Sequence, residues 1–127
     1  MHMKTLTLND FMQLRRLVYR GAQPLEFTLW RLAFENCRIE DALDVLSCYQ
    51  NEDGGFGYNL EANLWNPNSW PMVTGYAIGT LRRMSFDDKD HPIVTGILKY
   101  LAVTITDKGW LGAIPSNNDY SHAPWFG

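Results

Sequence analysis

Apolar residues recur every three or four positions along most of this chain, and this spacing constrains the fold more than any other feature. Near the N-terminus, for example, one stripe is formed by Leu8, Phe11, Leu14, Leu17 and Val18. Such a period is typical of amphipathic helices, whereas a half-buried strand would alternate apolar and polar residues. Convincing strand alternation is absent from the sequence. We therefore expect an all-α fold in which about five helices pair as antiparallel hairpins.

Local signals place the ends of these helices. The expected ranges are 8–18, 24–36, 39–50, 70–84 and 92–105. Pro24 suits a first helical turn, where its missing N–H costs nothing, and Ser69 is expected to be the N-cap of the fourth helix. Gly75 and Gly79 lie four residues apart on that helix. They predict a face that a neighbouring helix approaches closely.

Two long segments, 51–69 and 106–127, lack helical period and are rich in Gly, Pro and Asn. Ordered loops of this length in a small domain tend to be functional. A degenerate repeat relates the starts of the two loops. An offset of 54 residues aligns Asp53, Gly55 and Phe56 with Asp107, Gly109 and Trp110. Periods of this size indicate stacked helical hairpins.

Composition bounds the size and class of the fold. A chain of 127 residues with 46% apolar residues has enough core to fold as one domain, 1–127, without a disulfide or a metal. We expect residues 1–6 to be a flexible tail, and Cys37 and Cys48 to be reduced thiols in the cytosol.

Charge and hydropathy argue against two classes of partner. The 11 basic and 14 acidic residues give a net charge of −3, and the arginines occur as scattered pairs rather than a stripe. Nucleic acid is therefore not an expected partner. We also expect no membrane span and no signal peptide, because no apolar run is long enough. A cytoplasmic protein is the resulting expectation.

The segment 50–57, Gln-Asn-Glu-Asp-Gly-Gly-Phe-Gly, carries a recognisable turn. Its glycines permit positive φ, its aromatic ring can fill a seam between hairpins, and its Gln and Asp can bond backbone groups at helix ends. It resembles the Q-x-x-D-G-G-F/W signature of the terpenoid cyclase and protein prenyltransferase fold, an α/α toroid of about six helical hairpins.

Further segments extend this resemblance over nearly the whole chain. They are Trp65-Asn-Pro-Asn-Ser69, Pro115-Ser-Asn-Asn-Asp-Tyr120 and His122-Ala-Pro-Trp125. Together with the turn they are similar to a family of uncharacterised bacterial toroid proteins labelled prenyltransferase-like or squalene-cyclase-like. The resemblance implies a partial α/α toroid and an apolar or isoprenoid small-molecule ligand.

The length of the chain bears on assembly. Relatives in that family continue for several more hairpins, whereas five helices supply about two and a half. A half-toroid would expose more apolar helix surface than soluble monomers usually show. We therefore expect a truncated member of the family that forms a homodimer.

The resemblance also brings the two long loops together at one end of the fold. The amide and indole side chains of the loops would then surround a concave site. Such a site could bind a ligand with a polar headgroup and an apolar or sugar-like body. Candidate ligand-binding residues are Asn63, Trp65, Asn66, Trp70, Asn118 and Trp125; Asn68, Asn117 and Tyr120 lie beside them. Weak candidates for catalysis are Glu61, Asp119 and His122. In the competing interpretation, the asparagines cap turns and the charged groups are merely solvated.

The sequence gives little support for a metal site or a diphosphate-binding site. The acidic run 87–90 resembles terpene-enzyme clusters but has the wrong spacing, and it precedes Pro92, where acids simply solvate a turn. No Cys/His pair has the spacing of a zinc site. We expect neither a metal nor a cofactor.

Three functional hypotheses remain open. The first is a toroid protein that binds an apolar or isoprenoid ligand and does not act as an enzyme by itself. The second is a non-catalytic scaffold that acts as a homodimer. The third and weakest is a fragment of a carbohydrate-active α/α barrel, with Glu61 and Asp119 as the carboxylate pair.

Overall fold

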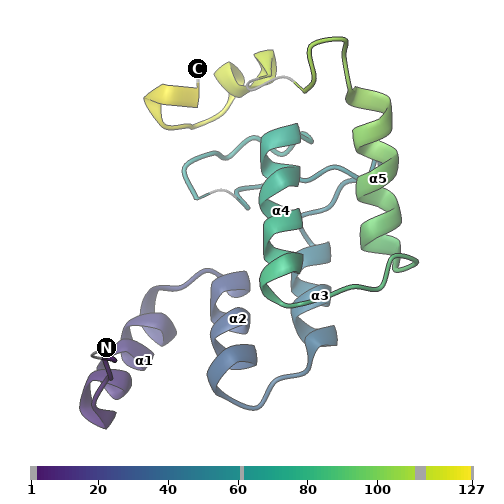
Figure 1. Ribbon diagram of the computed structural model, residues 1–127. Coiled ribbons are helices and arrows are strands. Elements are labelled where there is room, and N and C mark those ends of the chain that lie inside the picture. Colours follow the sequence, from purple (N-terminus) through teal and green to yellow (C-terminus); the bar gives the residue numbers. More distant parts are fainter. Residues whose placement is uncertain (1–2, 61, 111–113, 127) are drawn as a thin grey trace. The chain divides into compact units, whose positions relative to one another are not determined.

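The computed structural model describes residues 3–60, 62–110 and 114–126 (Figure 1). Within these ranges the chain forms five α-helices and two short 3₁₀-helices. The α-helices are α1 (Leu8–Gly21), α2 (Pro24–Phe34), α3 (Ile39–Ser47), α4 (Pro71–Arg83) and α5 (Pro92–Thr104). The 3₁₀-helices are η1 (Pro115–Asp119) and η2 (Pro124–Phe126). The described part of the chain contains isolated β-bridges but no strand, which confirms the all-α fold.

The helix starts follow from local chemistry. Pro24, Pro71 and Pro92 each occupy the first turn of a helix, where no N–H is needed. Thr7 and Asp10 form a capping box at the start of α1, in which each side chain bonds the backbone N–H of the other residue. None of the helices in the described ranges is long and apolar enough to cross a bilayer.

Two details of the fourth helix differ from the sequence expectation. Its N-cap is Trp70, and the Ser69 hydroxyl instead donates to Asp53 Oδ1 at 2.6 Å. The predicted close approach at Gly75 and Gly79 was wrong, because a Cβ at either position would meet no described atom within 4 Å. The close approach in this protein occurs at other glycines, in the turn after α3.

The chain divides into two compact units, Met1–Val45 and Leu46–Gly127. The boundary falls within α3. The predicted single domain stays a prediction.

In the first unit, α1 packs against α2 mainly through aromatic rings. Phe11 stacks on Trp30 with ring centroids 5.3 Å apart, and Tyr19 meets Phe27 edge-on at 4.8 Å. Rings in these geometries attract one another beyond the area that they bury. No residue of α1 is fully buried.

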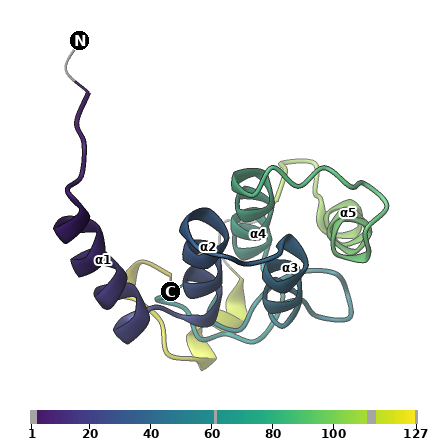
Figure 2. The same cartoon turned by 90° about the horizontal axis from the view of Figure 1, so that it is seen from below.

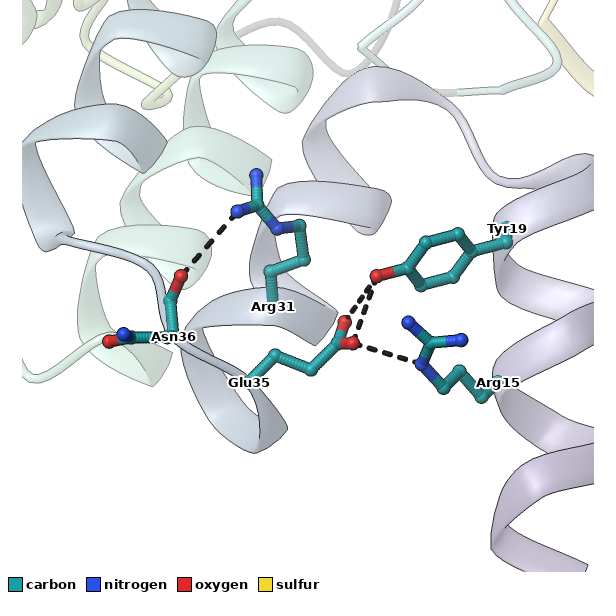
Figure 3. Close-up of polar contacts among 5 residues, drawn as sticks. All are labelled: Arg15, Tyr19, Arg31, Glu35 and Asn36. Carbon is teal, nitrogen blue, oxygen red and sulfur yellow. Dashed lines mark hydrogen bonds and ion pairs between the residues drawn. The ribbon is translucent and has the colours of Figure 1, made fainter.

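A polar cluster connects α1 to Glu35, the residue that follows α2 (Figure 3). Arg15 Nε lies 2.9 Å from Glu35 Oε1, and the Tyr19 hydroxyl lies 2.9 and 2.8 Å from the two carboxylate oxygens. The Arg15 guanidinium also covers the Tyr19 ring at 4.2 Å. The hydrogen bond from Tyr19, followed by that from Arg15, lowers the pKa of Glu35.

In the second unit, α4 and α5 form an antiparallel hairpin. Its buried positions repeat every three or four residues: Val73, Ala77 and Leu81 on α4, and Ile93, Ile97 and Tyr100 on α5. This is the spacing of one helical face. Figure 1 shows that the segment entering α4 and the segment leaving α5 meet the hairpin at the same end, and Figure 2 views the two helices nearly end-on.

Candidate functional site

The two long loops of the second unit are joined by backbone hydrogen bonds. Trp65 N donates to Ser121 O at 3.0 Å, and Ala123 N donates to Asn63 O at 2.9 Å. Between these bonds, Leu64 and His122 form an antiparallel bridge. Segments about sixty residues apart in the sequence therefore form one small platform.

Asparagine side chains fix this platform from inside. Asn66 is 1% exposed, and its Nδ2 donates to Ser116 Oγ and to Asn117 Oδ1, both at 2.9 Å. Its Oδ1 accepts from the backbone and side-chain nitrogens of Asn68 at 3.0 and 2.9 Å. All four bonds lie within the protein, so Asn66 holds the two loops together. Its buried neighbour Asn117 belongs to the same structural junction.

Other candidate ligand-binding residues are divided between the surface and the core. Trp65 and Trp125 are 58% and 71% exposed, and Asn63 and Asn118 are also exposed. Trp70, in contrast, is 1% exposed at the start of α4. These residues therefore differ widely in exposure, and their proposed role in binding stays a prediction.

The two described candidates for catalysis, Asp119 and His122, are not hydrogen-bonded to each other. His122 Nδ1 lies 2.6 Å from the carbonyl oxygen of Tyr120, which can only accept, so Nδ1 carries the proton. Asp119 is exposed at the end of η1, and its carboxylate makes no bond to a described side chain. Glu61 lies outside the described residues, so its pairing with Asp119 stays a hypothesis.

The acidic run before α5 has the role of a turn. Asp88 Oδ1 accepts from Asp90 N at 3.0 Å, and His91 Nδ1 caps the helix by accepting from Ile93 N at 3.2 Å. Among the described residues, no three His, Cys, Asp or Glu side chains are grouped to hold a metal ion.

Side chains of the turn 50–57 are hydrogen-bonded to two other parts of the second unit. Gln50 Nε2 donates to Gly54 O and across to Ile93 O, at 3.0 and 3.1 Å. Asn51 Nδ2 donates to Pro67 O and to Ser69 Oγ, both at 2.9 Å. These side chains therefore connect the turn to the first turn of α5 and to the loop before α4.

Phe56 completes the same turn and is fully buried. Its N–H donates to Thr74 Oγ1 at 3.0 Å, and its carbonyl oxygen accepts from Trp70 N at 3.1 Å. The Thr74 hydroxyl in turn donates to Trp70 O at 2.9 Å. The turn is thus locked to the first turn of α4.

The turn approaches α5 without intervening side chains. Gly54 has a φ of +89°, and a Cβ there would collide with the carbonyl oxygen of Gly96. A Cβ at Gly55 would lie 2.8 Å from Cε2 of Tyr100. Glycine is required at 54 on both counts, because L residues rarely adopt that φ and no space exists for a side chain.

The aligned turn 104–110 is built differently. Its positive-φ glycine is Gly109, which the offset of 54 pairs with Gly55 rather than Gly54. Trp110 is 46% exposed, and its Nε1 donates to Leu101 O at 3.0 Å. Phe56 fills the core, whereas Trp110 caps a helix end.

A cavity of about 350 Å³ opens beside the first turn. Its lining residues are Asp53, Ser69, Pro71, Tyr100, Thr104 and Ile114. This volume lies within the range of small-molecule sites, which are mostly apolar with a few polar groups. None of the loop residues put forward from the sequence as binding or catalytic lines it, so far as the chain is described.

Two of the polar groups in the wall are already used inside the protein. Ser69 Oγ donates to Asp53 Oδ1 and accepts from Asn51, and Thr104 Oγ1 donates to Tyr100 O at 2.8 Å. The second oxygen of Asp53 and the hydroxyl of Tyr100 differ: neither bonds any described residue. These are the two groups that remain for a ligand.

Tyr100 is unusual because its side chain is buried while its hydroxyl is left without a protein partner among the described residues. The residue is 5% exposed. Burial, assisted by the negative charge of Asp53, raises the pKa of the Tyr100 phenol to about 12. The phenol therefore keeps its proton at neutral pH and is available as a hydrogen-bond donor.

The sequence indicated one side of this cavity and not the other. Asp53 belongs to the recognised turn, but Tyr100, Thr104 and Ile114 were not expected to line a site. The available signal was the helical spacing of Gly96 and Tyr100, which places a small and a large residue one turn apart on α5. Only the fold shows that the turn packs against both.

Comparisons with known proteins add no relative. The scan against protein-family models, the search of curated proteins and the search of solved structures each find no match to this chain.

Proposed function

We propose that this chain is a non-catalytic helical binding protein, a short relative of the prenyltransferase-like toroid proteins, and that it holds a small, largely apolar molecule in the cavity beside Asp53. The observation that carries the proposal is Tyr100, whose side chain is largely buried in the wall of the cavity while its hydroxyl bonds no described group and stays accessible. A ligand in the cavity can therefore form a hydrogen bond with this hydroxyl without displacing a bond within the described chain.

The arrangement of charged groups supports binding rather than catalysis. Asp119 and His122, the described candidates for acid/base work, do not line the cavity. Within the described wall, Asp53 is the one acidic residue and Tyr100 stays protonated at neutral pH. A phenol with a pKa of about 12 is a poor proton donor for catalysis near pH 7, because the best catalytic pKa lies close to the working pH.

The experiment is an NMR titration of the ¹⁵N-labelled protein with 3-methylbut-2-en-1-ol, a five-carbon isoprenoid alcohol. We expect saturable shifts of the amides of Asp53, Ser69 and Thr104. The amide of Gly21, at the exposed end of α1, serves as an internal control. Native mass spectrometry of freshly purified protein tests for a larger co-purified lipid. No saturable shift at these amides together with no co-purified molecule would refute the proposal.

A second candidate function, a scaffold that acts as a homodimer, is favoured by the exposed apolar side chains of α1. Leu8 and Leu17 are 78% and 66% exposed, and no residue of this helix is buried. Light scattering after size exclusion tests it. Leu17→Lys should convert a dimer to a monomer, while Gln13→Lys, at an exposed polar position, should not. A wild-type protein that elutes as a monomer at high concentration would exclude this function.

A further inference from the structure

The two unbonded groups in the cavity wall have opposite hydrogen-bonding roles. The Tyr100 hydroxyl is a donor on a largely buried side chain, and the second oxygen of the Asp53 carboxylate can only accept. Both line the same cavity, while Pro71 and Ile114 supply apolar surface.

The roles discriminate between ligand headgroups. A hydroxyl oxygen accepts from Tyr100 while its own proton is donated to Asp53. An ammonium group forms a charge-assisted bond with Asp53, but it can only donate, so it leaves the phenol proton without an acceptor and must give up its strong hydration. A carboxylate can only accept, and it would stand next to the negative charge of Asp53.

We propose that the cavity beside the turn selects a neutral alcohol: a small aliphatic molecule whose hydroxyl group bridges Tyr100 and Asp53. This inference rests on the proposed function and names the ligand class of the same cavity. The body of the ligand contacts Pro71 and Ile114, and Ser69 and Thr104 keep their internal bonds.

Asp53 has two separable tasks, which makes a clean variant possible. Its Oδ1 accepts from Gly55 N at 2.9 Å and from Ser69 Oγ at 2.6 Å, which holds the turn. Asp53→Asn retains an oxygen for those bonds and replaces the outer oxygen with an NH₂ donor. Tyr100→Phe removes the phenol hydroxyl and keeps the ring.

The test compares three probes with one five-carbon skeleton: 3-methylbutan-1-ol, 3-methylbutan-1-amine and 3-methylbutanoate. NMR titration at pH 7 of the whole chain gives the dissociation constant of each from the amides around the cavity. We expect the alcohol to bind several-fold more tightly than the amine and at least about tenfold more tightly than the carboxylate, since each lost or unpaired bond is worth about 2- to 10-fold.

The variants separate the two contacts. Tyr100→Phe should raise the dissociation constant of the alcohol by about fivefold. It should also reduce the ratio between the dissociation constants of the amine and the alcohol. Asp53→Asn should improve carboxylate binding relative to the alcohol, because an acceptor is replaced by a donor. Thr95→Ser, at an exposed position on α5 outside the cavity wall, keeps the hydroxyl that bonds Pro92 O and is the control expected to bind the alcohol as the wild type does.

The outcomes distinguish the two levels of the proposal. Equal or tighter binding of the amine or the carboxylate overturns the ligand class and leaves the binding function standing. The same is true if the alcohol binds at these amides but Tyr100→Phe has no effect. Binding of none of the three probes overturns both.

Discussion

The most regular segment of this protein buries less than one of its irregular segments. Helix α1 is capped at its start and amphipathic along its length, yet none of its residues is buried. The loop 51–69 has no helix, yet Phe56, Leu60 and Leu64 are at most 4% exposed. Regular hydrogen bonding and burial are therefore separate properties in this chain.

The difference comes from side-chain hydrogen bonds. In the loop, Asn51, Asp53 and Asn66 satisfy backbone groups that a helix would satisfy by itself. Those bonds allow an irregular backbone to enter the interior, and they leave a cavity beside it. On α1 the backbone satisfies itself, so nothing obliges its side chains to become buried. The following predictions test this contrast, from the largest effect to the smallest.

Gly54→Ala should cause the largest loss of stability. The new Cβ would collide with Gly96 O, and the φ of +89° disfavours alanine. We expect a loss of about 3 kcal/mol or more in the free energy of unfolding, measured by urea denaturation. Gly75→Ala is the matched control, because its Cβ meets open space. That change, within a helix, should be neutral or stabilise by up to about 1 kcal/mol. Equal losses in the two variants would contradict the packing of the turn on α5.

Asn66→Ala should come next. It deletes an amide that bonds Ser116, Asn117 and Asn68, and it leaves buried partners unsatisfied. We expect a loss of about 2–3 kcal/mol in urea denaturation. Asn118→Ala, in the same loop platform but exposed, should change stability by less than about 0.5 kcal/mol. If Asn118→Ala proved the more damaging, the buried junction would not be what holds the loops.

Alkaline pH should expose the buried phenol. Because the pKa of Tyr100 is raised to about 12, its stabilising contribution is complete below pH 10, the ordinary pKa of tyrosine in an unfolded chain, and is lost as the pH rises toward 12. Between pH 10 and pH 12 the free energy of unfolding of the wild type should fall by about 2 kcal/mol more than that of Tyr100→Phe. Urea denaturation at each pH measures this difference. Parallel pH profiles would show that Tyr100 is not buried as a neutral phenol.

Glu35→Gln should have the smallest effect, because its cluster on the α1–α2 pair is partly exposed. The pKa of Glu35 is lowered, so its contribution is present above the ordinary carboxyl pKa of 4.5 and is lost as the pH falls through the lower folded value. We expect a small fall in melting temperature at pH 7 that disappears near pH 3. Gln13→Ala, at an exposed position on α1, is the control. A larger loss than that of Asn66→Ala would reverse the contrast between the regions.

The helices were largely predictable from the sequence because their signals are local. The periodicity of apolar residues and the prolines at 24, 71 and 92 placed each start within about two residues. Ser69 was misassigned as a cap because its hydroxyl is taken by Asp53, a partner 16 residues away. Gly75 and Gly79 were misread for the same kind of reason: spacing on a helix does not reveal which element approaches it.

The candidate site was predictable only in part. The sequence placed the two loops together, and their asparagines do bridge them. The sequence did not show that Asn66 is buried and fully bonded. An asparagine uses the same amide groups to cap a turn and to bind a ligand, so the residue type alone does not distinguish the two roles. Tyr100 was missed because a buried phenol on a helix normally finds a partner, and its exposure to a cavity depends on tertiary packing alone.

Hydrogen–deuterium exchange, at a protein concentration where light scattering shows a monomer, tests the contrast between the two regions most directly. Amide protection reports local opening rather than the presence of a helix. The account predicts that the loop amides of Phe56, Tyr58 and Trp70, which donate to Thr74 Oγ1, Asn66 O and Phe56 O, exchange more slowly than the amides in the middle of α1. Slower exchange in α1 than at these loop amides would contradict it.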